Sequence, residues 1–152
     1  MRWSFPWIML SIVSTVPAAA QSGLSPELLS DWKRNRSTVL SYIDAMPDSA
    51  MGFRPTPGVR TFAEQFEHIV TTNLDVAALR RHADTTYAYL LRALQQASPA
   101  QLRRPVAMYG QPPQPAVRLA VLSYEHSVWT LGQVVAYLRL NGVTPPEYRM
   151  PF

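Results

Sequence analysis

The sequence of 152 residues contains no cysteine. Disulfide bridges, thiolate metal ligands, a cysteine nucleophile and lipid attachment through an N-terminal cysteine are therefore excluded. The sequence also lacks a glycine-rich phosphate-binding loop, a Gly-x-Ser-x-Gly element and a His-Glu-x-x-His element, which disfavours the enzyme classes built on these motifs. The folded state must be stabilised by the packing of side chains.

No concentrated basic surface is evident either, because the formal net charge of +4 is only a mild imbalance. Basic residues occur singly or in pairs, without a stripe in which they alternate with aromatic residues. The pairs are Arg34 and Arg36, Arg80 and Arg81, and Arg103 and Arg104. Solvated surface positions explain this pattern, whereas nucleic-acid binding requires a basic face. We expect no nucleic-acid partner.

The first twenty residues have the three parts of a signal peptide in order. Arg2 gives a positive start, "SFPWIMLSIVSTV" is apolar but too short to span a bilayer comfortably, and the small residues of "AAAQ" allow cleavage after Ala20. An apolar N-terminal helix docked on the domain and an uncleaved anchor are the alternatives. We expect residues 1–20 to be removed, which makes the protein periplasmic or secreted, without a stable membrane anchor.

Apolar residues at helical spacing dominate the rest of the chain. The pattern predicts four helices joined by irregular segments in which proline and glycine are frequent. These helices are expected over residues 26–46, 61–80, 85–98 and 115–141. The segment after Ser98 has room for one short helical turn. The expected architecture is one domain, residues 21–152, with four helices around a common core.

Three helix ends carry recognisable signals. Ser25 is a suitable N-cap, with Pro26 at the first helical position. Thr61 and Glu64 have the spacing of a capping box, in which each side chain satisfies the backbone N–H of the other residue. Gly142 fits the left-handed position that closes the last helix.

The last predicted helix has apolar residues on two sides. One stripe alternates steps of four and three residues, and the other occupies much of the opposite side. The first contains Val117, Val121, Tyr124, Val128, Leu131, Val135 and Leu138, and the second contains Leu122, Trp129, Tyr137 and Leu140. We therefore expect this helix to be buried around most of its circumference, with Trp129 in the core or in a pocket wall.

Two histidines could meet inside such a fold. His68 shares a side of the second predicted helix with Glu64, and His126 shares a side of the last helix with Gln133. Neutral imidazole is a ligand for zinc, nickel, copper or iron, and catalytic zinc sites usually have three protein ligands. His68 and His126 therefore provide one ligand fewer than such a site usually has. His82 is expected at the end of the second helix, where it would interact with the helix dipole.

Two segments together resemble the DinB-like family, also called DinB/YfiT. They are "RPTPGVRTFAEQFEHI", residues 54–69, and "EHSVWTLGQVVAYLRLNGVTPP", residues 125–146, and the similarity extends over residues 32–146. The resemblance implies an all-α four-helix bundle in an up-down-down-up arrangement. It further implies a divalent metal bound by a histidine of the second helix and by a His-x-x-x-His pair of the last helix.

Transferred residue by residue, the family's metal site falls on His68 and His126. The second histidine of the pair is replaced by Thr130, and a hydroxyl is a poor ligand for zinc or nickel unless it is deprotonated. Glu64 already has a capping role, and Glu125 projects about 100° away from His126 around the helix. The residues expected to surround the site are Glu64, Trp129, Thr130 and Gln133.

These features leave two hypotheses open. In the first, the protein is a hydrolase or thiol transferase, in which zinc or nickel held by His68 and His126 activates water or a thiol. In the second, the domain is a metal-free, non-catalytic binding or structural module. The partner would be an unidentified small molecule in either case, and a homodimer remains an alternative to a monomer.

Overall fold

The computed structural model describes residues 23–70, 76–108 and 110–148. The predicted signal peptide, residues 1–20, lies outside these ranges. None of the helices within them has the length and apolar character needed to cross a membrane.

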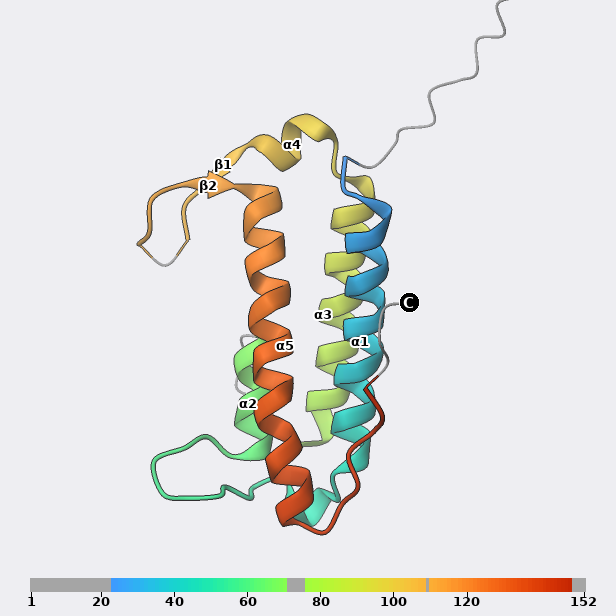
Figure 1. The fold of residues 1–152 in the computed structure, drawn as a ribbon, viewed down its shortest axis with the longest axis vertical. Helices are drawn as coiled ribbons and strands as arrows, with labels where there is room; N and C mark the ends of the chain where they lie inside the picture. Colours follow the sequence, from blue (N-terminus) through green and yellow to red (C-terminus); the bar gives the residue numbers. More distant parts are fainter. Residues whose placement is uncertain (1–22, 71–75, 109, 149–152) are drawn as a thin grey trace, which may run out of the picture.

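The chain is mainly helical, as the sequence predicted, with one small hairpin. Its elements in order are α1 (Pro26–Ala45), the 3₁₀ turn η1 (Asp48–Ala50), α2 (Phe62–Val70), α3 (Val76–Gln96), α4 (Pro99–Arg103), β1 (Pro105–Val106), β2 (Gln114–Pro115) and α5 (Ala116–Leu140). Helices α1, α3 and α5 are the long elements (Figure 1). Helix α1 contacts α3 and α5, and the short α2 contacts the same two helices. These contacts enclose one core.

The core combines aromatic and aliphatic side chains from all four of these helices. Phe62 and Phe66 of α2 are fully buried, as are Val39 of α1, Leu79 of α3 and Leu138 of α5. The phenylalanine rings contact each other with centroids 5.0 Å apart. Burial of these apolar surfaces is the main source of stability in a chain that has no covalent cross-links.

The helix signals read from the sequence have the expected geometry. The Ser25 hydroxyl accepts a hydrogen bond from the Leu28 backbone N–H over 3.2 Å. At the other end of the fold, Gly142 has φ +71°, and the Val143 N–H donates to the Leu138 carbonyl over 2.9 Å. The predicted N-cap and left-handed C-cap are thus confirmed.

The predicted boundary between the second and third helices was wrong. Helix α2 ends at Val70, and α3 runs without a break from Val76 through the residues that were expected to separate two helices. Ala83 is fully buried, Asp84 accepts hydrogen bonds from Arg36 of α1, and His82 lies inside α3 instead of at a helix end. The polar run around residue 82 contains no glycine or proline and includes good helix formers, so nothing in it stops a helix.

The connection between α3 and α5 contains more structure than the one expected turn. Ser98 and Gln101 form a capping box at the start of α4. Strands β1 and β2 then pair antiparallel, with Pro105 opposite Pro115 and Val106 opposite Gln114. Two-residue strands that contain proline have no alternating pattern, which is why the sequence did not reveal them.

The expectation that α5 is buried around most of its circumference was also wrong. Leu122, Trp129 and Leu140 are all exposed, and Trp129 retains 68% of its accessible surface. Tyr137 is buried, because it lies about 80° around the helix from Trp129, on the side that faces the core. The second apolar stripe is therefore a solvent-facing line of three residues rather than a second core face.

Candidate metal site

The structure brings His68 of α2 and His126 of α5 together. Their Nε2 atoms are 3.0 Å apart, the ring centroids are 4.9 Å apart, and the ring planes are inclined by 80°. His68 is exposed and His126 is half-buried, so the pair lies at the surface of the α2–α5 contact. Two nitrogen atoms from separate helices thus point at each other and can be reached from solvent.

The environment of the pair favours neutral imidazole at His68. Desolvation lowers the pKa of this side chain, and the positive charge of Arg60 and the neighbouring His126 lower it further. A neutral imidazole has one nitrogen with a free lone pair, which can accept a hydrogen bond or bind a metal ion. One ring can donate its N–H to the other, and either ring can be the donor.

Thr130, which replaces the expected third histidine, has its hydroxyl hydrogen-bonded to the helix backbone. Only 1% of its surface is exposed, and its hydroxyl donates a hydrogen bond to the His126 carbonyl over 3.0 Å. The hydroxyl therefore bonds back into its own helix one turn before it. Thr130 supports the backbone that carries His126 and does not add a ligand.

Glu64 acts as a helix cap, as the capping-box pattern predicted. Its carboxylate accepts a hydrogen bond from the Thr61 N–H over 2.6 Å, and the Thr61 hydroxyl accepts one from the Glu64 N–H over 3.1 Å. The bond from the Thr61 backbone lowers the pKa of Glu64, and the charge of Arg54, 3.7 Å away, contributes in the same direction. Glu64 has partners that explain it without a metal.

A bridge of polar side chains joins α2 to α5 beside the histidines. The Gln65 amide donates hydrogen bonds to the Tyr137 hydroxyl over 3.1 Å and to the Gln133 side-chain oxygen over 3.5 Å. The Tyr137 hydroxyl donates in turn to the Arg60 carbonyl over 2.8 Å. Gln133 thus links two helices, and the bridge holds α2 against α5. Sequence analysis missed Gln65, although a polar residue between Phe62 and Phe66 on a core-facing side was a signal for it.

Trp129 flanks the pair from the solvent side. Its ring centroid lies 6.3 Å from that of His126, with an angle of 61° between the planes. Trp129 is therefore not a core residue, because its side chain is exposed on the outer face of α5, and its role as a pocket wall stays a prediction. It can still contact a molecule that approaches His126.

No third ligand completes the pair within the described ranges. Among these residues, no group of three or more His, Asp or Glu side chains is placed to hold one metal ion. Glu125 is exposed, as expected for its position on another side of α5. Any metal bound here would have two protein ligands, His68 and His126, and its remaining positions would be filled by water or a small molecule.

Similarity to known proteins agrees with this fold. Residues 31–81 match the family model described as the DinB superfamily. A DinB-like protein from Bacillus cereus has a similar solved structure, with a TM-score of 0.71 and 17% identity over 80% of this chain and 95% of that one. The DinB-like protein YjoA from Bacillus subtilis gives a TM-score of 0.71 and 20% identity over 83% of this chain and 99% of that one. No curated protein is significantly similar in sequence.

Both structural neighbours are distant in sequence, so their likeness establishes the fold and not an activity. The family match covers most of α1, all of α2 and the start of α3, so it includes His68 of α2. This match over residues 31–81 and the shared fold confirm the resemblance inferred from the sequence: the chain is similar to the DinB superfamily in sequence and to DinB-like proteins in fold.

Proposed function

We propose that this DinB-like domain binds one divalent metal ion, zinc or nickel, through Nε2 of His68 and Nε2 of His126. The observation that carries the proposal is the 3.0 Å separation of these two atoms. Two nitrogens that are each about 2.1 Å from one ion lie about 3.0 Å apart at a right angle and about 3.4 Å apart at a tetrahedral angle. The distance between the two nitrogens therefore needs little change to accept an ion, although the rings must turn so that both nitrogens face it.

The surrounding side chains support this role. The lowered pKa of His68 reduces competition from protons, because a protonated imidazole cannot bind a metal. The Gln65 amide and the Tyr137 hydroxyl hold α2 against α5, which fixes the distance between the two rings. Thr130 stabilises the turn of α5 that carries His126. These contacts keep the two nitrogens close before any ligand arrives.

An ion with only two protein ligands would have several positions open to a substrate. When bound, such an ion lowers the pKa of coordinated water or thiol, which is the chemistry of a hydrolase or thiol transferase. We accordingly propose a metal-dependent hydrolase or transferase with an atypical site.

The domain would be a four-helix bundle in the up-down-down-up arrangement, supported by the parallel course of α1 and α5 and the opposite course of α3 (Figure 1).

We further propose that the protein is exported and acts in the periplasm or outside the cell. The support for this lies in the order of charged, apolar and small residues within positions 1–20. Mass spectrometry of the secreted product tests it, and the expected N-terminus is Gln21. A product that begins at Met1 would contradict cleavage.

Metal analysis of the purified mature protein tests the metal proposal. We expect about one zinc or nickel ion per chain and an increase in melting temperature when metal is added, because an ion that binds only the folded state stabilises it. His68→Ala and His126→Ala should each abolish both effects.

His82→Ala is the matched control, because it removes the third histidine from the interior of α3. This variant should retain the metal and the shift in melting temperature. A wild-type protein that contains no metal and whose melting temperature ignores added zinc and nickel would contradict the proposal. It would leave a metal-free pair, held by one imidazole N–H donating to the other ring.

A further inference from the structure

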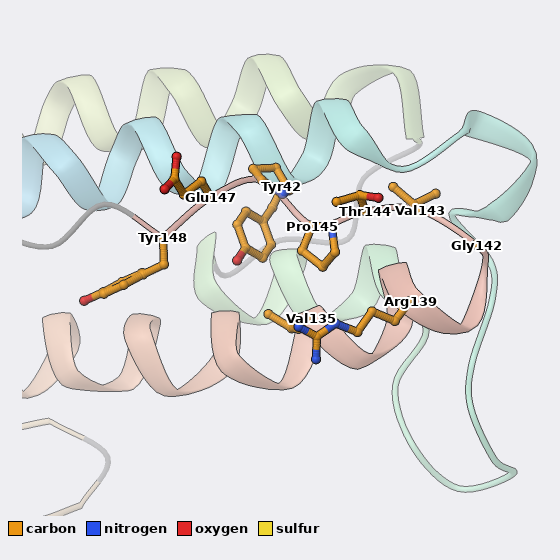
Figure 2. A pocket seen from close by; sticks show the side chains of 10 residues that line it. Tyr42, Val135, Arg139, Gly142, Val143, Thr144, Pro145, Glu147 and Tyr148 are labelled. Atoms are coloured by element: carbon orange, nitrogen blue, oxygen red, sulfur yellow. The ribbon is translucent and has the colours of Figure 1, made fainter.

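The face of α5 opposite the histidines borders a groove against α1. Val135 lies nine residues after His126, which is about half a turn around the helix. The groove contains two cavities, with volumes of about 600 and 260 Å³, and both are lined by Tyr42, Val135 and Tyr148. Residues 142–148 run back along the groove and form one of its walls (Figure 2). Such volumes are within the range of small-molecule sites.

Tyr42 of α1 places a hydroxyl between the two helices without a partner. The side chain retains only 4% of its surface, and Figure 2 shows its ring pointing from α1 toward α5. The hydroxyl makes no hydrogen bond with any residue of the described ranges. Burial raises the pKa of Tyr42, so the hydroxyl remains protonated at neutral pH and can donate. Tyr42 lines both cavities, and its oxygen is not sealed off from solvent, so a ligand or water in the groove can bond to it.

Arg139 of α5 supplies a positive charge on the same groove. Its guanidinium has no ion pair with any carboxylate in the part of the chain that the structure describes. Glu147, the one acidic residue among the described residues lining the larger cavity, is exposed and stands on the α1 side of the opening (Figure 2). The mouth of the groove thus offers a guanidinium and a phenol to a ligand, and both are hydrogen-bond donors.

The inner end of the groove differs from the mouth. Val128, Leu131 and Val135 line the smaller cavity, which is mostly apolar. Arg34 also lines it, but this guanidinium is neutralised by Asp31 at 2.8 Å and donates to the Tyr124 hydroxyl over 3.1 Å. The free positive charge is therefore confined to one end of an apolar groove.

We propose that this groove binds an anionic amphiphile, a small molecule with a carboxylate head and an unbranched alkyl chain. The carboxylate would accept hydrogen bonds from Arg139 and from the Tyr42 hydroxyl. The alkyl chain would lie against Val128, Leu131 and Val135 in the inner cavity. A guanidinium matches a carboxylate in charge and in geometry, and the apolar walls gain affinity with each methylene group they cover.

Calorimetric titration of the mature protein with decanoate, and with 1-decanol as the uncharged probe, tests the proposal. We expect saturable binding of one decanoate per chain and about tenfold weaker binding of decanol, since a charge-assisted hydrogen bond is lost. Equal affinities for the two probes, or no saturable binding of decanoate, would overturn the proposal.

Substitutions locate the site. Arg139→Gln should lower the affinity for decanoate about tenfold and leave that for decanol unchanged, and Tyr42→Phe should lower the affinity for decanoate about fivefold. Arg118→Gln is the matched control, because it removes the same charge from an exposed position on the same helix, away from the groove. Circular dichroism establishes that each variant is folded. Equal losses in the Arg118 and Arg139 variants would overturn the proposal, because they would indicate a non-specific charge effect.

Discussion

Helix α5 carries two polar clusters on different sides, and the clusters differ in burial and in the number of hydrogen bonds among their side chains. On the inner side, the Asn35 side-chain oxygen accepts hydrogen bonds from the Tyr87 hydroxyl over 2.6 Å and from the Ser127 hydroxyl over 2.9 Å. These three side chains are buried. On the other side, the His68 and His126 side chains hydrogen-bond only to each other among the described residues, and the pair is open to solvent.

This difference separates a structural role from a binding role. A buried polar cluster whose members bond to one another rigidifies the core. The two imidazoles at the surface have ring nitrogens that water or an ion can reach. We therefore expect changes to the inner cluster to alter stability and changes to the outer pair to alter metal binding.

Removal of Asn35 should have the largest effect on stability. In Asn35→Ala, Tyr87 and Ser127 lose their shared acceptor inside the core, and we expect the free energy of unfolding to fall by about 3 kcal/mol. Urea denaturation measures the change. His126→Ala without metal should cost less than about 1 kcal/mol. Similar losses for the two variants would remove the distinction between the clusters.

Restoration of a third histidine should strengthen metal binding at the outer pair. Thr130→His inserts a large side chain at a buried position and removes the bond to the His126 carbonyl, so the metal-free variant should lose about 2 kcal/mol. Added zinc or nickel should recover more stability than it adds to the wild type, because three imidazoles bind more tightly than two. Thermal unfolding with and without metal measures both effects. Thr130→Val is the control, and its stability should not respond to metal more than that of the wild type.

Tyr87→Phe should have a smaller effect, because Ser127 and Asn35 can still bond to each other. We expect a loss of about 1 kcal/mol near neutral pH. Burial raises the pKa of Tyr87 to about 12, so the folded state favours the protonated phenol. The wild type should therefore lose stability as the pH rises from about 10 toward 12, and this loss should be smaller in Tyr87→Phe. Identical alkaline profiles of melting temperature would contradict the assignment.

Glu64→Ala should have the smallest effect. The substitution removes the exposed carboxylate of a capping box, so the melting temperature should fall slightly at neutral pH while the metal content stays unchanged. Because the folded-state pKa of Glu64 is lowered, its contribution is present at neutral pH and disappears as the pH falls through that pKa. The wild type and variant should thus converge in acid. Loss of metal in this variant would show that Glu64 is a ligand.

Local signals in the sequence predicted the helices and several of their ends, since apolar spacing and capping residues act within one or two turns. The meeting of His68 with His126 could be anticipated because each lies on a defined side of a helix. The break between α2 and α3 was placed too late, because a polar run without glycine or proline was read as a stop. Signal cleavage, metal binding and dimerisation stay predictions.

Other features depend on contacts between distant segments and had no local signature. The Asn35 and Ser127 side chains meet although they are 92 residues apart, and each residue alone is an ordinary polar residue on a helix. The α1–α5 groove depends on the position of residues 142–148, which form one of its walls. The glycine at position 142 predicts the end of α5, but it does not predict where the following residues lie.

The position of Trp129 beside His126 means that intrinsic tryptophan fluorescence can report on the histidine pair. After cleavage of the leader, the chain would have two indoles, Trp32 in the core and Trp129 at the surface, 6.3 Å from His126 between ring centroids. An open-shell ion such as nickel at the histidine pair would sit close enough to quench emission from the outer indole while leaving the inner one bright. Emission at the long-wavelength side of the spectrum, where an exposed indole emits, would then follow occupancy of the site in real time, without a label.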